Sequence, residues 1–252
     1  MIEKIEFYNK NTIVILPHLD DEFALTPLLN NIDNLTIIYC SERLDDTLIK
    51  QNKRRDENIK SLQTFGIGIK NIIYLNDNFL VNDLELISSS VKIYDYILNY
   101  ITKSKQRISQ IITLNLEGGH PDHDAVALIV SKIAAKLPIK PIYVPAYNNR
   151  KTLYFFPISV FRPLKSQEKY FSEIKLNNFS WFNSIKVSLI YKSEIYAFIK
   201  LFPFILFQFL FSKSIYVSNI IDLDSINWNN NFTKKRYNSD IKIIMREIDK
   251  IQ

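Results

Sequence analysis

The chain has 252 residues, of which 47% are hydrophobic and 23% are charged. This length and balance fit one large soluble domain, or a core with an elaboration, and exclude a disordered chain. The formal net charge of +6 favours anionic partners. The lysines and arginines are scattered along the chain, however, so we do not expect nucleic-acid binding, which would need a contiguous basic face.

The cysteine content and the first residues bear on the compartment. Cys40 is the single cysteine, so an intramolecular disulfide is excluded and a reducing compartment is favoured. Residues 1–6 are charged and lack an apolar signal core. We therefore expect a cytoplasmic protein.

Short apolar runs rich in β-branched residues alternate along the chain with segments of helical periodicity. Such runs predict buried parallel strands, and the alternation predicts an α/β fold with a doubly wound, mostly parallel sheet. The predicted strands are residues 12–16, 35–40, 71–75, 108–114 and 141–144; the predicted helices are residues 45–65, 83–101 and 124–137.

The βα alternation stops near residue 148, where the chain becomes rich in Phe, Tyr, Asn and Lys. We therefore divide the chain into a core, residues 1–147, and a C-terminal elaboration, residues 148–252. We expect the elaboration to pack on the core and to shape a substrate pocket.

The elaboration contains an intensely apolar run, residues 201–211, between Lys200 and Lys213. The run is too short to span a bilayer, and it contains Pro203. A buried helix or packed wall is the favoured interpretation. The alternative is an interfacial segment that dips into a membrane surface, with the lysines at the level of the headgroups.

The three histidines all lie in two acidic clusters, each directly after a predicted strand. One cluster is Pro-His-Leu-Asp-Asp-Glu at residues 17–22, and the other is Glu-Gly-Gly-His-Pro-Asp-His-Asp at residues 117–124. Taken alone, each set of acids is explained equally well as favourable charges in a first helical turn. Together they predict a metal site, because ligands bind at the carboxyl ends of parallel strands and imidazoles with carboxylates suit zinc.

The spacing within the clusters suggests roles. A catalytic zinc takes three protein ligands and keeps one open position. His18 and Asp21 are three residues apart, which brings them to one side of a helical turn, and His123 can complete the set. Asp20 is then free to act as general base on a metal-bound water.

The remaining members of the clusters suit supporting roles. His120 can face the substrate and, when protonated, stabilise the oxyanion that forms as a carbonyl is attacked. Asp122 is placed to orient one of the imidazoles, and Glu22 to orient His18. Gly118 and Gly119 are adjacent in a chain with four glycines, which indicates a loop where backbone shape matters.

These motifs resemble the signatures of the LmbE-like, or PIG-L-type, zinc-dependent deacetylases of N-acetylated sugars. Residues 18–22 match the family's His-Pro-Asp-Asp-Glu except at Leu19, and residues 120–123 match its His-Pro-Asp-His in full. Weaker matches are Arg-x-x-Glu at residues 54–57 with Phe-Gly at 65–66, and a Lys…Ser-Glu stretch at 186–194. The resemblance covers roughly residues 10 to 195.

The resemblance implies a Rossmann-like fold, one Zn²⁺ per chain and an N-acetylglucosamine-type substrate. It implies these residue roles: His18, Asp21 and His123 as metal ligands, Asp20 as general base, His120 as oxyanion stabiliser, Asp122 as the residue that orients His120, and Arg54 as a sugar contact.

The chain departs from the family pattern at two positions, Leu19 and Glu194. Leu19 replaces the usual proline, so the metal site should survive but its loop loses rigidity. Glu194 stands where glutamine is common, and we assign no ligand role to it.

We therefore expect a hydrolase that removes the acetyl group from an N-acetylated amino sugar, either a free glycoside or one linked to a nucleotide or a lipid. If residues 201–211 contact a membrane, it would work at the inner face. A zinc amidase of non-sugar acyl amides is an alternative, because the same centre serves any amide. A second alternative is an inert homologue that binds a glycan or a membrane, against which the complete set of site residues argues.

Overall fold

The structure is a computed structural model. It describes residues 11–29, 32, 34–148, 150, 159–175, 178–207, 214–228, 246 and 250, without the side chains of residues 159, 178–181, 204, 205 and 207.

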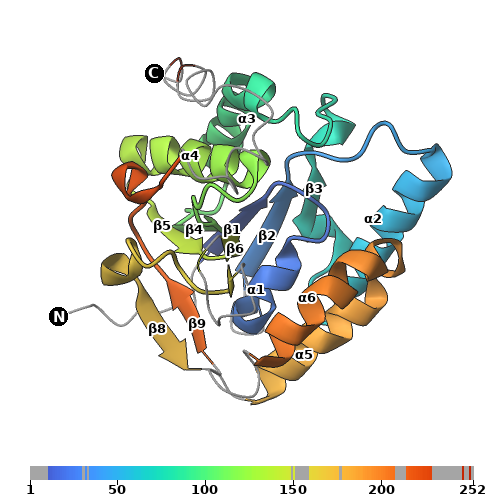
Figure 1. Ribbon diagram of the computed structural model, residues 1–252. Helices are drawn as coiled ribbons and strands as arrows, with labels where there is room; N and C mark the ends of the chain where they lie inside the picture. The colour runs from blue at the N-terminus through green and yellow to red at the C-terminus, as the bar shows by residue number, and fades with distance from the viewer. Residues whose placement is uncertain are drawn as a thin grey trace.

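The centre of the molecule is a parallel five-stranded sheet in the order β3-β2-β1-β4-β5 (Figure 1). Every strand falls on one of the predicted apolar runs, so the α/β, doubly wound fold is confirmed. The strands are β1 (Asn11–Leu16), β2 (Asn34–Tyr39), β3 (Ile72–Tyr74), β4 (Gln110–Leu114) and β5 (Lys140–Val144).

Three of the four core helices overlap the predicted periodic segments, whereas the first, Glu22–Leu29, was not predicted. The last predicted helix begins earlier than expected, at Pro121, because proline suits the first helical position and the His120 side chain caps the helix by accepting from the Asp122 N–H. The helices are α1 (Glu22–Leu29), α2 (Leu48–Gln63), α3 (Ser90–Lys103) and α4 (Pro121–Lys136). Short 3₁₀ turns occupy Ile69–Asn71, Leu75–Asp77, Ile87–Ser89, Glu168–Tyr170, Lys192–Glu194 and Leu223–Ser225.

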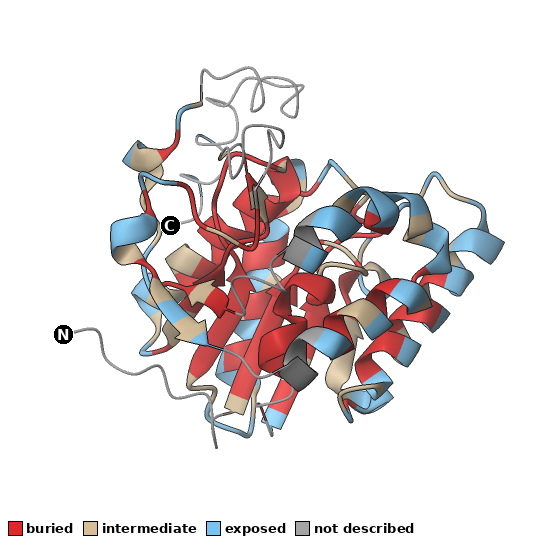
Figure 2. Cartoon of the chain, turned by 60° about the horizontal axis from the view of Figure 1, so that its bottom comes forward, coloured by how far each residue is buried: buried red, intermediate tan, exposed pale blue. Residues whose placement is uncertain are grey.

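Both faces of the sheet are covered. Side chains alternate between faces along each strand, so Ile13 and Ile15 pack with α3 and α4, whereas Val14 and Leu16 pack with α1. Figure 2 shows the buried sheet between these layers. Burial on both sides explains why the strands are continuous apolar runs rather than alternating ones.

The C-terminal part adds helices on the α1 side of the sheet and two small antiparallel ladders. α5 packs against α1 (Figure 1). α6 contacts β7. Ser218 continues the main sheet at the β5 edge through paired backbone hydrogen bonds with Tyr143, at 2.8 and 3.0 Å. The added elements are β6 (Tyr147–Asn148), β7 (Ser159–Val160), β8 (Ser172–Lys175), α5 (Asn178–Ile190), α6 (Ile195–Phe207) and β9 (Ser214–Val217).

The apolar run at residues 201–211 is only partly described. Residues 201–207 are the second half of α6, with Pro203 inside the helix, and residues 208–211 lie outside the described residues. Phe202 is 45% exposed and Leu206 is 37% exposed, so these two side chains are not in the core. Among the described helices, none is long and apolar enough to cross a bilayer.

Candidate metal centre

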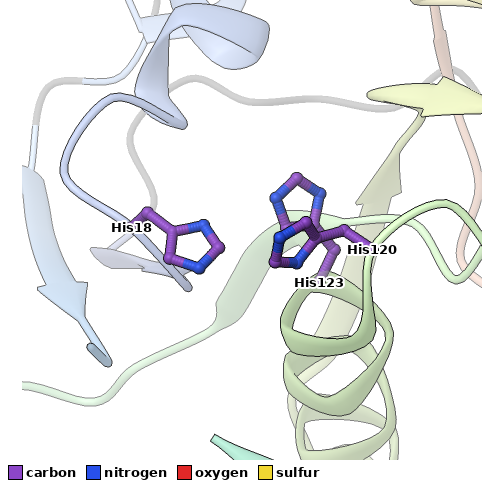
Figure 3. Close-up of side chains that lie close together, drawn as sticks. All are labelled: His18, His120 and His123. Carbon is purple, nitrogen blue, oxygen red and sulfur yellow. The ribbon is translucent and has the colours of Figure 1, made fainter. Parts of the chain in front are cut away.

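The two histidine clusters meet at one edge of the sheet. His18 follows β1, and His120 and His123 stand at the start of α4, which follows β4. β1 and β4 are neighbours at the point where the strand order reverses, the usual ligand position in doubly wound sheets. The three imidazoles face one another (Figure 3), with ring centroids 4.9 Å apart for His18 and His120 and 4.8 Å apart for His120 and His123.

Asp21 connects the two clusters. Its Oδ2 lies 3.1 Å from His18 Nδ1, and its Oδ1 lies 3.2 Å from His123 Nε2. Burial by itself would raise the pKa of Asp21, but His123 and His18 outweigh it and hold that pKa well below its usual value. Asp21 therefore contacts both of the other predicted ligands, and its carboxylate stays ionised.

The other ring nitrogen of His18 faces two further carboxylates. His18 Nε2 lies 3.0 Å from Asp83 Oδ1 and 3.1 Å from Asp122 Oδ2. Burial would lower the pKa of His18, but Asp21, Asp122 and Asp83 together raise it well above its usual value. A cluster this rich in acids favours a positive charge at its centre.

Asp83 is a site residue that the sequence analysis missed. The helical periodicity of residues 83–101 placed it in a helix, whereas it lies in the loop that joins β3 to α3. The usable signal was its place after the third strand, because the carboxyl ends of parallel strands share one edge of the sheet.

Asp122 orients a different imidazole from the one that the resemblance implies. Its carboxylate contacts His18, while its backbone N–H donates to His120 Nδ1 at 3.3 Å. The same carboxylate oxygen accepts the Leu84 N–H at 2.8 Å, and Leu84 has a left-handed backbone with φ of 68°. Asp122 thus fixes His18 through its side chain and His120 through its backbone.

His120 differs from the protonated state that we expected. Burial lowers its pKa well below the usual value, and the charges of His123 and His18 lower it further. Because Nδ1 accepts the Asp122 N–H, the neutral imidazole carries its proton on Nε2. His120 therefore offers a neutral N–H donor instead of a cation.

Arg54 lies beside the predicted base. Its Nη2 is 3.7 Å from Asp20 Oδ1, and its Nη1 donates to Glu194 Oε1. Arg43 donates to the same Glu194 oxygen at 3.0 Å. Glu194 therefore bridges two arginines at the wall of the site.

The two weaker family matches contact each other. Glu57, from the Arg-x-x-Glu match on α2, accepts the Ser193 N–H at 3.2 Å and the Ser193 hydroxyl. Arg54, one helical turn earlier, contacts Glu194. Helix α2 therefore holds the turn between α5 and α6.

The structure corrects the expectation for Glu22. Its carboxylate does not orient His18; it accepts hydrogen bonds from the hydroxyls of Tyr39, at 2.9 Å, and Tyr191. Glu22 begins α1, and each helical residue turns about 100°, so its side chain points into the core instead of the site. Burial raises the pKa of Glu22 to about 8.

Leu19 and Gly119 restrain the two histidine loops, which follow β1 and β4. The Leu19 carbonyl accepts Asn58 Nδ2 at 2.7 Å and the Tyr191 hydroxyl, so contacts restrain the loop where the family has proline. A Cβ on Gly119 would lie 2.5 Å from the Tyr147 carbonyl oxygen, so any side chain at this position would displace the loop.

A cavity of about 420 Å³ opens at this edge of the sheet. The donor atoms of His18, His120 and His123 lie within 4.8 Å of one another, so the residues fit a metal ion. The polar lining is His18, Asp20, Asp21, Arg43, Arg54, Asp83, His120, His123, Glu194 and Lys200; the remaining lining is Phe23, Ala24, Ala146, Tyr147, Val160, Phe161, Ala197, Phe198 and Leu201.

Comparison with solved structures finds deacetylases. A deacetylase triple mutant of the teicoplanin biosynthetic pathway has a TM-score of 0.58 at 14% identity, over 83% of this chain and 97% of that one. The zinc-inhibited form of teicoplanin deacetylase has a TM-score of 0.53 at 13% identity, over 84% and 99%. The antimicrobial reagent A40926 pseudoaglycone deacetylase has a TM-score of 0.52 at 14% identity, over 75% and 84%.

No family model and no curated protein sequence matches the chain. Fold and site together define a Rossmann-like protein with a candidate metal centre where β1 and β4 diverge. More particularly, the chain has the fold of the LmbE-like deacetylases, as the resemblance at its two histidine motifs implies.

Proposed function

We propose that this protein is a zinc-dependent hydrolase that removes the acetyl group from an N-acetylated amino sugar. One observation carries the proposal: Asp21 contacts both His18 and His123, and Asp20 stands next to it at the cavity. The deacetylases of similar fold support the reaction class.

In this proposal His18, Asp21 and His123 hold one zinc ion, and His120 stays free for the substrate. Bound zinc would polarise the acetamide carbonyl and make water easier to deprotonate. The name of one similar structure describes it as the zinc-inhibited form of teicoplanin deacetylase. The choice of zinc therefore rests on the nitrogen and oxygen donors and on the resemblance.

The protein groups then divide the proton and charge transfers. Asp20 takes a proton from the attacking water, and Arg54, 3.7 Å away, keeps its carboxylate in place. His120 donates its Nε2–H to the carbonyl oxygen as negative charge develops there. The C–N bond breaks, Asp20 returns its proton to the nitrogen, and acetate and an amino sugar leave.

We propose that the elaboration, residues 148–252, serves the core by completing the substrate pocket. α6 contributes Phe198 and Leu201 to the cavity lining, and Arg54, which also lines the cavity, would contact a sugar hydroxyl. An N-acetylglucosamine unit in a free glycoside, or linked to a nucleotide or a lipid, would offer hydroxyls to Arg54 and an acetamide to the metal centre. A non-sugar acyl amide would use the same centre.

The test pairs metal analysis of the purified protein with acetate release from a panel of N-acetylated sugars, their nucleotide conjugates and simple acyl amides. We expect about one zinc per chain and release from at least one sugar. Release from the simple amides alone would favour the amidase. Bound zinc without release from any compound would favour the inert homologue.

We also propose peripheral contact of α6 with an anionic membrane at the cytoplasmic side. Tyr196 is 79% exposed and Ile199 60% exposed on this helix, and the neighbouring Lys192 and Lys200 are exposed. Apolar side chains flanked by lysines suit an interface with acidic headgroups.

Co-sedimentation with vesicles tests this contact. We expect binding to vesicles with acidic phospholipid, weaker binding to neutral vesicles, and loss of binding in Ile199→Glu. Equal sedimentation of the wild type and Ile199→Glu would remove α6 from the membrane contact.

A further inference from the structure

The cavity has an apolar part to which the proposed proton and charge transfers assign no role. Phe23 of α1, Phe161 after β7, and Phe198 and Leu201 of α6 form an apolar wall beside the histidines. The Phe23 ring centroid lies 5.6 Å from that of Phe161 and 4.9 Å from that of Phe198. Three separate segments thus bring aromatic rings together at one place, which we call the aromatic wall.

The backbone at Phe161 supports a binding role for this wall. Phe161 has φ of 60°, a left-handed conformation that costs a bulky residue about 1–2 kcal/mol. Its N–H donates to the Ala146 carbonyl at 2.9 Å, which holds the conformation. Strained backbones of this kind persist mostly where binding or catalysis needs the side chain in a fixed place.

An acetyl group cannot fill such a wall by itself, because it offers only one methyl group. The cavity, at about 420 Å³, has the size of a site for a small molecule with an apolar part. Seating a hydrocarbon chain there would remove apolar surface from water on both partners.

We infer that the substrate carries a hydrocarbon chain close to the scissile amide and that the aromatic wall binds it. This inference rests on the proposed function, since it assigns a second group to the same substrate. The chain is either the acyl part of the amide or an alkyl group on the sugar. Both present the same chemistry to Phe161 and Phe198.

Two series of probes separate the sources. One is glucosamine N-acylated with acetyl, butanoyl, hexanoyl or octanoyl groups; the other is the methyl, butyl and octyl glycosides of N-acetylglucosamine. Dissociation constants are measured by calorimetry on zinc-loaded Asp20→Asn, so that turnover of the probes is slow. Each seated methylene should tighten binding by up to about fourfold, in the series whose chain reaches the wall.

Variants of the wall complete the test. Phe198→Ala and Leu201→Gln, made in the same Asp20→Asn background, should flatten the dependence of the dissociation constant on chain length. Leu201 is only half-buried, so its variant should fold. Phe182→Ala is the matched control, because Phe182 is 62% exposed on α5. A flat response in both series overturns the inference. A steep response without acetate release by the wild type would instead overturn the proposed function alone.

Discussion

The hydroxyl of Tyr191 donates a hydrogen bond to the backbone carbonyl of Leu19, 172 positions earlier in the chain. Leu19 stands between His18 and Asp20, so this bond holds the loop that carries a proposed ligand and the proposed base. Asn58 of α2 donates to the same carbonyl at 2.7 Å. Two long-range donors thus restrain the loop at the position where the family that the chain resembles has proline.

Tyr191→Phe should weaken zinc binding severalfold and lower the free energy of unfolding by about 1–3 kcal/mol. The variant removes a buried donor that serves both Leu19 and Glu22. Zinc affinity is measured by competition with a chelator, and stability by urea denaturation.

The matched control is Tyr196→Phe, which removes a hydroxyl from a residue that is 79% exposed. This variant should keep the wild-type zinc affinity and the wild-type free energy of unfolding. If Tyr191→Phe binds zinc as tightly as Tyr196→Phe does, Tyr191 does not position the loop.

Zinc stoichiometry should distinguish the proposed ligands from His120. All three imidazoles have donor atoms within 4.8 Å of one another, so a three-histidine set competes with the proposed one. We expect Asp21→Ala and His123→Ala to lose zinc, and His120→Ala to keep it while acetate release falls. Equal zinc loss in His120→Ala and His123→Ala would instead assign His120 as a ligand.

Asp20→Asn should lower the rate of acetate release by about 10²–10⁴-fold while zinc stays bound. The amide cannot accept the proton of the attacking water, but no proposed ligand is changed. Asp45→Asn, at an exposed position, is the control and should keep wild-type activity. Retained activity in Asp20→Asn would move the base to another residue.

Stability should fall as the pH rises from about 5 to 8, in part through Glu117. Glu117 is 4% exposed, and burial raises its pKa to about 8. An unfolded chain releases this proton near pH ~4.3, so between the two values the folded state binds more protons and loses stability with rising pH.

Glu117→Gln should therefore flatten the dependence of the melting temperature on pH. A slope remains, because Glu22 also has a pKa raised to about 8 and acts with the same sign. Glu85→Gln, at an exposed position, should keep the wild-type slope. A Glu117→Gln slope as steep as that of Glu85→Gln would show that Glu117 is already ionised in the folded protein.

The sequence by itself determined the strands of the sheet, three of the core helices and the position of both histidine loops at the ends of strands. Apolar runs report burial on both faces, and a residue directly after a parallel strand must lie at the carboxyl edge of the sheet. That His18 and His123 share one site follows from the adjacency of β1 and β4, which the tertiary structure supplies.

Only the tertiary structure decided which side chains surround these loops. Asp83 and Tyr191 reach the site from segments whose spacing carries no signature. Glu194 comes from a weak family match that did not predict its contact with Arg54, and Glu22, inside the motif, turns away to Tyr39. Periodicity along the chain records which face of an element is buried. The partner on that face depends on how distant segments pack, a property of the whole folded chain that no local pattern contains.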